Sequence, residues 1–117
     1  MNVLIVDDEP DIRLMMRNLL GSEGWDTEEA ASGKDALRMM DSFSSFDVVV
    51  LDYKMPGLTG IELARNLREE GLAPPIIICS AYLNPAIEEE ARQLGVPTIA
   101  KTDLDRLVGM IRESAGT

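Results

Sequence analysis

The stretch that decides the fold is Asp47-Val48-Val49-Val50-Leu51-Asp52-Tyr53-Lys54-Met55-Pro56-Gly57. Four apolar residues in a row, without the alternation of a half-exposed strand, predict a strand covered on both faces, as in a parallel sheet. Pro56-Gly57 predicts a turn soon after it. Ligands of open parallel α/β sheets bind at the carboxyl ends of the strands, so Asp52 is the first candidate for a functional residue. Taken alone, an ordinary loop aspartate is the simpler interpretation.

Short apolar runs alternate with helical patterns along the whole chain. Strands are predicted at residues 3–6, 25–31, 48–51, 76–79 and 96–100, each followed by a helix. The second strand is acidic and is expected at a sheet edge. The helix starts are indicated by Pro10, Ser32, Thr59-Gly60-Ile61-Glu62, Asn84-Pro85 and Thr102. This alternation predicts an α/β fold: a doubly wound five-stranded parallel sheet with helices on both faces, in the flavodoxin-like strand order 2-1-3-4-5.

The helices are expected to pack on the sheet through apolar stripes. The stripe of the last helix consists of Leu104, Leu107, Val108 and Ile111. The methionines at positions 15, 16, 39 and 40 are interpreted as core residues. Residues 42–45 are expected to form a loop before the Asp47 strand.

Length and composition narrow the class of protein. The 117 residues suit one domain with a real core. Eleven Lys and Arg against 21 Asp and Glu give a net charge of −10, which disfavours direct binding to nucleic acid or to an anionic membrane. The single cysteine, Cys79, lies in an apolar run and is interpreted as a buried structural thiol, which fits a reducing compartment. With no signal sequence and no apolar run near 18 residues, a cytoplasmic protein is expected.

Polar residues follow four of the five predicted strands: Asp7-Asp8, Asp52, Ser80 and Lys101. Carboxylates this close repel by about 4 kcal/mol per pair at 4 Å and an effective dielectric near 20, so a cation is expected among them, or one stays protonated. Mg²⁺ is the expected cation, because it is a hard ion that prefers oxygen ligands. Such a site suits phosphoryl transfer to the Asp52 carboxylate, with Mg²⁺, Lys101 and Ser80 holding the outer oxygens of the phosphoryl group.

Each of these residues also has a simpler interpretation. Asp7 or Asp8 can cap the first helix, Ser80 can bond local backbone, and Lys101 can be a solvated lysine. Their joint arrival at successive strand ends of one sheet favours function.

The motifs Leu4-Ile5-Val6-Asp7-Asp8-Glu9-Pro10, Val50 to Gly57, Ser80-Ala81 and Lys101 resemble the receiver domain of bacterial two-component response regulators, over essentially the whole chain 1–117. The resemblance implies that Asp52 is the phosphoacceptor. It also implies that Asp8 binds Mg²⁺ directly and Asp7 mainly through water, and that Asp52 and the Lys54 carbonyl complete the protein ligands. It implies that Ser80 and Lys101 contact the phosphoryl group. It also implies a signalling domain rather than an ordinary enzyme, one that catalyses only its own phosphorylation and slow dephosphorylation.

The implied phosphoryl donor is the phosphohistidine of a sensor histidine kinase or of a histidine phosphotransfer protein. The chain has no histidine of its own, which agrees with a donor in another molecule. The implied surface for an output domain or a downstream protein is the face of the fourth helix, the fifth strand and the last helix. Lys54 and Tyr82 are expected to border the approach of water to the phosphoryl group, and to lengthen its lifetime.

Two residues depart from the family pattern. The family usually carries Tyr or Phe three residues before the lysine, where this chain has Thr98. The family's Lys-Pro is Lys101-Thr102 here, so a cis peptide bond is not expected. Both departures concern the switch and leave the phosphorylation site intact.

Other functions fit the sequence less well. A receiver-like module that binds partners without phosphorylation would have lost an acidic residue or the lysine, and neither is lost in this chain. A magnesium phosphohydrolase of the haloacid-dehalogenase type needs an acid two residues after the nucleophile, where Lys54 stands. A flavin-binding protein of this fold needs a Gly- and Ser/Thr-rich phosphate loop after the first strand, and no such loop follows that strand in this sequence. The sequence leaves open whether residues 114–117 lead into an output domain.

Overall fold

The structure is a computed structural model that describes residues 1–42, 46–71 and 74–116, without the side chains of residues 40–42. Its elements are β1 (Asn2–Val6), α1 (Pro10–Gly21), β2 (Asp26–Ala30), α2 (Gly33–Ser42), β3 (Val48–Leu51), α3 (Gly60–Glu69), β4 (Ile76–Ser80), α4 (Pro85–Gln93), β5 (Thr98–Ala100), the 3₁₀ helix η1 (Lys101–Arg106) and α5 (Leu107–Ser114). All strand pairs are parallel, in the order β2-β1-β3-β4-β5. The predicted flavodoxin-like fold is confirmed.

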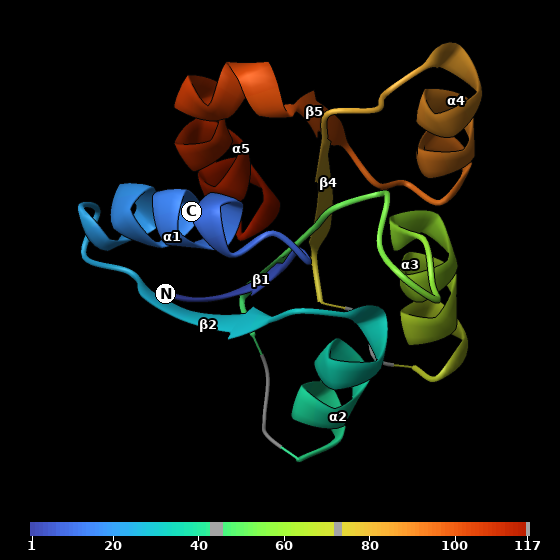
Figure 1. The fold of residues 1–117 in the computed structure, drawn as a ribbon, viewed down its shortest axis with the longest axis horizontal. Helices are drawn as coiled ribbons and strands as arrows, with labels where there is room; N and C mark the ends of the chain where they lie inside the picture. The colour runs from blue at the N-terminus through green and yellow to red at the C-terminus, as the bar shows by residue number, and fades with distance from the viewer. Residues whose placement is uncertain (43–45, 72–73, 117) are drawn as a thin grey trace.

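Helices cover both faces of the sheet (Figure 1). Helices α1 and α5 pack on one face, where Met16, Leu20, Leu107 and Ile111 meet Val48 and Val50. Helices α2, α3 and α4 pack on the other, where Ala36, Leu67 and Ala91 meet Val49 and Leu51. Successive residues of a strand point to opposite faces, so covering both faces buries all four residues of β3. This arrangement explains why β3 is an unbroken apolar run.

The predicted capping signals are confirmed for three helices. Thr59 and Glu62 form a reciprocal capping box at the start of α3. The Asn84 side chain accepts from the Ile87 N–H at the start of α4. The Ser32 hydroxyl accepts from the Asp35 N–H at 3.1 Å, at the start of α2. These local bonds set where each helix begins, and so set the length of the loops at the carboxyl edge of the sheet.

The predicted cap at Thr102 is wrong. Lys101 directly follows β5 and begins the 3₁₀ helix η1, whose N-cap residue is Ala100. The backbone of Asp103 is not helical, and α5 begins only at Leu107. No cis peptide bond occurs in the described part of the chain, as expected for Lys101-Thr102.

The edge strands are shorter than predicted. Strand β5 begins at Thr98 because the Val96 N–H bonds back to the Ala91 carbonyl at 2.9 Å, and Pro97 has no N–H to donate. Strand β2 begins at Asp26, so Trp25 precedes the strand and packs against the core beside α5. Ser42, predicted to begin a loop, is instead the last residue of α2. Residues 43–45 of that predicted loop lie outside the described residues, as does Thr117.

The prediction that Met15 is a core residue is wrong, since its side chain is 51% exposed. The Met16 and Leu20 side chains face the sheet, and Met15 lies on the flank of the same helix. Met16 is buried and Met39 partly buried, whereas the Met40 side chain lies outside the described residues. Cys79 is buried and free, and burial raises the pKa of its thiol to about 12, in agreement with a structural role. No described helix has the length and hydropathy to span a bilayer.

Candidate functional site

The loop between β1 and α1 carries three acidic residues in sequence. Asp7 is 1% exposed, and its N–H extends the strand pairing by donating to the Ala30 carbonyl at 3.1 Å. Its Oδ1 accepts from the Glu9 N–H at 2.9 Å. Neither Asp7 nor Asp8 caps the helix, because the N-cap residue is Glu9, without a side-chain capping bond. The loop therefore presents one buried carboxylate, on Asp7, and two exposed ones, on Asp8 and Glu9.

Asp52 follows the buried strand β3 and is itself 3% exposed. Its N–H donates to the Val6 carbonyl at 2.9 Å, which places Asp52 beside the end of β1. Helix α3 starts against the same loop, where the Gly60 N–H donates to the Tyr53 carbonyl at 2.8 Å. A Cβ atom on Gly60 would lie 2.4 Å from the Asp52 carbonyl oxygen. Only glycine allows this approach.

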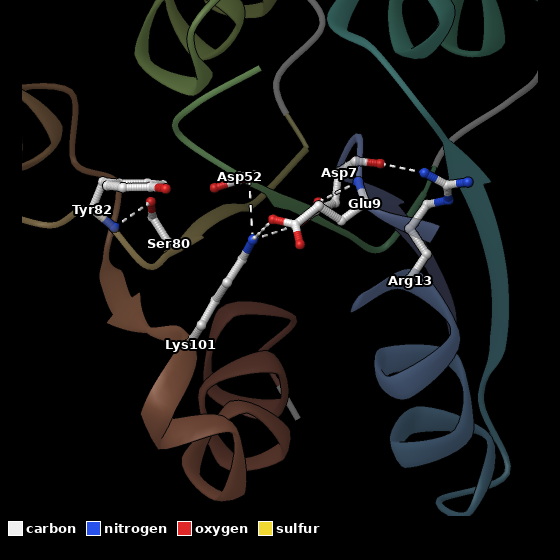
Figure 2. Close-up of polar contacts among 7 residues, drawn as sticks. All are labelled: Asp7, Glu9, Arg13, Asp52, Ser80, Tyr82 and Lys101. Carbon is white, nitrogen blue, oxygen red and sulfur yellow. Dashed lines mark hydrogen bonds and ion pairs between the residues drawn. The ribbon is translucent and has the colours of Figure 1, made fainter. Parts of the chain in front are cut away.

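Lys101 reaches from the start of η1 into the acidic cluster (Figure 2). Its Nζ lies 2.9 Å from Asp7 Oδ2 and 3.2 Å from Asp52 Oδ2, and 3.6 Å from Glu9 Oε1. The side chain is 11% exposed. Lys101 is thus an internal cation between two buried carboxylates rather than a solvated lysine.

Burial and neighbouring charges shift the pKa values of Asp52 and Lys101. Burial, followed by the charge of Asp7, raises the pKa of Asp52, and Lys101 and Ser80 offset this only in part. Burial alone would lower the pKa of Lys101, but its hydrogen bond to Asp7 and the charge of Asp52 outweigh burial and raise it. The Lys101 ammonium therefore stays protonated at neutral pH. The acidic cluster around it still carries more negative than positive charge.

Ser80 ends β4 and is fully buried. Its hydroxyl oxygen accepts from the Tyr82 N–H at 3.1 Å, so the serine is tied to the loop that follows it. Tyr82 is 56% exposed, and the Lys54 ammonium lies 4.7 Å from the centroid of its ring. Lys54 and Tyr82 line, together with Asp8 and Asp52, a pocket of ≈ 390 Å³.

A divalent cation fits this set of oxygens. Asp7, Asp8, Glu9 and Asp52 each offer a carboxylate oxygen, and these four atoms lie within 4.8 Å of one another. Asp52 Oδ1 is buried and accepts no hydrogen bond, which is costly unless a ligand completes it. Hard oxygen donors of this kind suit Mg²⁺. The predicted Lys54 carbonyl ligand stays a prediction.

The structure brings all the predicted site side chains to one edge of the sheet, together with two residues that were not predicted from the sequence. Glu9 joins the acidic cluster, and the consecutive run Asp7-Asp8-Glu9 was the available signal. Arg13 donates to the Asp7 carbonyl at 2.6 Å from α1. No sequence signal distinguishes Arg13 from an ordinary helix-surface arginine.

Comparison with known proteins agrees with this architecture. A family model for the response regulator receiver domain matches residues 3–112. Sporulation initiation phosphotransferase F of Bacillus subtilis is 33% identical over 113 residues, which cover 95% of this chain and 90% of that protein. The positive alginate biosynthesis regulatory protein of Pseudomonas aeruginosa is 43% identical over 91 residues, which cover 75% of this chain. The match spans only 36% of that regulator's length.

Solved structures show the same fold. The receiver domain of Francisella response regulator 1452 has a TM-score of 0.89 at 30% identity, covering 97% of this chain and 95% of that one. Response regulator TrrA of Thermotoga maritima, solved in complex with Mg²⁺-BeF, has a TM-score of 0.84 at 29% identity, covering 97% of both chains. On this evidence, the chain belongs to the response regulator receiver domain family of two-component signal transduction.

Proposed function

We propose that this receiver domain accepts a phosphoryl group on Asp52 in a Mg²⁺-dependent reaction and passes the signal on through a conformational change. The proposal rests on the surroundings of the Asp52 carboxylate. Its carboxylate is buried at a strand end, with Oδ2 held by Lys101 and Oδ1 without a hydrogen-bond partner. A buried carboxylate with one unpaired oxygen is ready to accept a ligand at that oxygen.

The reaction forms an O–P bond to Asp52 while the N–P bond of a phosphohistidine breaks, and the histidine nitrogen keeps the electron pair. Asp52 acts as the nucleophile. Lys101, already beside Asp52, neutralises negative charge on the transferred group, and the Ser80 hydroxyl donates to one of its oxygens. The buried position of Asp52 limits access by water.

The proposed metal ligands are Asp8, Asp52 and the Lys54 carbonyl, with Asp7 acting mainly through water. When bound there, Mg²⁺ supplies positive charge that lowers the repulsion between the carboxylates and the incoming phosphoryl oxygens. Glu9 lies close enough to contribute directly or through water. The four carboxylate oxygens that lie within 4.8 Å of one another support a cation site here.

The proposed donor is the phosphohistidine of a sensor histidine kinase or of a histidine phosphotransfer protein. Since none of the 117 residues is a histidine, the donor group lies outside this domain. The net charge of −10 argues against nucleic acid and anionic membrane as direct partners of this domain. A cytoplasmic location stays a prediction.

The proposed output surface is the face of α4, β5 and α5. It holds a groove of ≈ 580 Å³ between α4 and β5, lined by residues that include Pro85, Val96 and Thr98. Thr98 is too small to act as a flipping aromatic switch. We propose that movement of the Ser80–Tyr82 loop transmits the change instead, because the Ser80 hydroxyl is bonded to the Tyr82 N–H.

A module that binds partners without phosphorylation remains the second candidate. No observation favours it over phosphorylation, because the acidic residues and Lys101 lie together in the site. The two candidate functions differ in whether Asp52 becomes phosphorylated.

The test uses acetyl phosphate as a small phosphoryl donor, with intact-protein mass spectrometry as the readout. We expect a gain of one phosphoryl group in the presence of Mg²⁺, and none when EDTA replaces it. Asp52→Asn should abolish the gain, whereas the control Asp47→Asn, at the opposite end of β3, should retain it. Equal phosphorylation of Asp52→Asn would disprove the assignment, and no phosphorylation of the wild type would favour the second candidate.

A further inference from the structure

Arg13 connects three elements of the fold next to the acidic cluster, and Figure 2 shows its bond to Asp7. Its side chain extends from α1, and one guanidinium nitrogen donates to the Asp7 backbone carbonyl at 2.6 Å. Its Nε donates to Glu29 Oε1, on the edge strand β2, at 3.0 Å. The side chain is only 16% exposed, so both bonds are largely shielded from water. Charge-assisted hydrogen bonds of this kind are stronger than neutral ones.

The Asp7 carbonyl belongs to the peptide group that joins Asp7 to Asp8. Rotation of that peptide plane changes the direction in which the Asp8 side chain leaves the backbone, because a planar peptide moves as one body. The other polar atoms of Asp7 already have partners. Its N–H donates to the Ala30 carbonyl, its Oδ1 accepts from the Glu9 N–H, and its Oδ2 pairs with Lys101. The bond from Arg13 fixes the remaining polar atom of this residue, the carbonyl oxygen.

Glu29 orients the guanidinium in turn. One of its carboxylate oxygens accepts from Arg13, and the other accepts from Arg17 at 2.9 Å. The Glu29 side chain is 28% exposed, so it is partly withdrawn from solvent. Glu29 on the edge strand β2 thus orients Arg13, and Arg13 in turn fixes the backbone carbonyl of Asp7.

From this geometry we infer that Arg13 is a positioning residue for the metal site, which sets the direction of the Asp7–Asp8 peptide and thereby the affinity for Mg²⁺. The inference rests on the proposed function, since it concerns the same metal site. Residues that orient metal ligands typically change metal affinity by about 10–100-fold when they are replaced. Arg13 touches the backbone of a proposed ligand rather than its carboxylate, so we expect an effect of about tenfold, at the low end.

Arg17 provides a matched control. It lies one helical turn further along α1, pairs with the same Glu29 carboxylate, and is 51% exposed. Its guanidinium donates to Glu29 and makes no hydrogen bond to the acidic loop among the described residues. Arg13→Gln and Arg17→Gln therefore both remove a Glu29 ion pair and one positive charge, but only Arg13→Gln releases the Asp7 carbonyl.

The experiment measures the Mg²⁺ dissociation constant by calorimetric titration, and urea unfolding in EDTA, for the wild type and four variants. Arg13→Gln should raise the dissociation constant about tenfold, and Glu29→Gln should raise it less. Arg17→Gln should leave it within about twofold of wild type, since exposed ion pairs contribute little. Arg13→Lys, which keeps the charge but lacks the planar fork, should restore part of the affinity. If Arg13→Gln does not fold, Arg13→Lys and Glu29→Gln carry the test.

An unchanged dissociation constant in Arg13→Gln, with lower stability alone, would show a purely structural role and overturn the inference. An equal rise in Arg17→Gln would also overturn it, because general charge would then explain the effect. A wild-type protein that binds no Mg²⁺ would refute the proposed metal site itself, together with the inference. The wild-type titration therefore separates failure of the proposed function from failure of the role of Arg13.

Discussion

The ammonium nitrogen of Lys54 lies 4.7 Å from the centroid of the Tyr82 ring. This cation–π contact joins the loop after β3 to the loop after β4, and both residues line the pocket that leads to Asp52. From the sequence, both residues are predicted to border the approach of water. The structure places them in contact with each other across the same pocket.

The first prediction concerns the lifetime of the phosphoryl group, which we expect to persist for many minutes or longer. Tyr82→Ala and Lys54→Ala should each shorten it, because a pair at an exposed site is worth about 0.5–1 kcal/mol. That range corresponds to a rate change of about two- to fivefold. Phosphate release after removal of the donor measures the lifetime.

Tyr82→Phe is the matched control for this prediction, because it keeps the ring and should keep the lifetime. Lys34→Ala controls for loss of an exposed lysine on α2. A wild-type lifetime of seconds, or no acceleration in either alanine variant, would rule out shielding by this pair.

The second prediction concerns stability and pH. Burial and the Asp7 charge raise the pKa of Asp52, so its ionised form is disfavoured in the folded protein. Protonation of Asp52 therefore favours folding: the gain is complete below its ordinary pKa of 3.8 and is lost as the pH rises through the folded-state pKa. At pH 7 we expect Asp52→Asn to raise the free energy of unfolding, on the order of 1 kcal/mol.

Urea unfolding in EDTA, at a series of pH values from 7 downward, measures this difference between Asp52→Asn and wild type. The advantage of the variant should shrink as the pH falls toward 3.8, because wild-type Asp52 then becomes neutral as well. A variant less stable than wild type at pH 7 would mean that the attraction of Lys101 outweighs burial and the repulsion by Asp7.

The third prediction concerns Gly60. A Cβ atom there would lie 2.4 Å from the Asp52 carbonyl oxygen, so Gly60→Ala must displace either the start of α3 or the loop that carries Asp52. We expect a loss of about 1–3 kcal/mol in the free energy of unfolding, the usual range for overpacking. Phosphorylation by acetyl phosphate should also slow down.

Gly109→Ala is the control substitution, because a Cβ atom at position 109 meets no atom within 4 Å. Gly109 lies inside α5, so alanine should stabilise the protein by about 0.5–1 kcal/mol. Equal effects of the two substitutions would contradict the proposed close packing against Asp52.

The fourth prediction concerns the output face. Mg²⁺ with beryllofluoride, used as a phosphoryl mimic, should shift the amide resonances of α4, β5 and α5 in wild type and in Thr98→Ala. Ser80→Ala should suppress the shifts, because it removes the hydroxyl that links the site to the Tyr82 N–H. Heteronuclear NMR spectra measure this. Resonances that stay fixed in wild type would reject transmission through the Ser80–Tyr82 loop.

Local sequence signals predicted most of the fold. The apolar run of β3 predicted a strand buried on both faces, and the Thr59-Glu62 box and Asn84 predicted the starts of α3 and α4. Such signals work because the bonds that they describe join residues only a few positions apart. The same reasoning failed at Thr102, where the chain forms a 3₁₀ turn instead.

By itself, the sequence predicted a parallel sheet and therefore which residues would meet at the carboxyl edge of that sheet. Asp7, Asp52, Ser80 and Lys101 could be grouped without coordinates, because parallel strands of one sheet end at the same edge. Only the tertiary structure decided how they meet: Lys101 between Asp7 and Asp52, Arg13 on the Asp7 carbonyl, and Lys54 on the Tyr82 ring. These contacts depend on helix rotation and side-chain rotamers, which are set by packing between segments far apart in the chain rather than by local sequence.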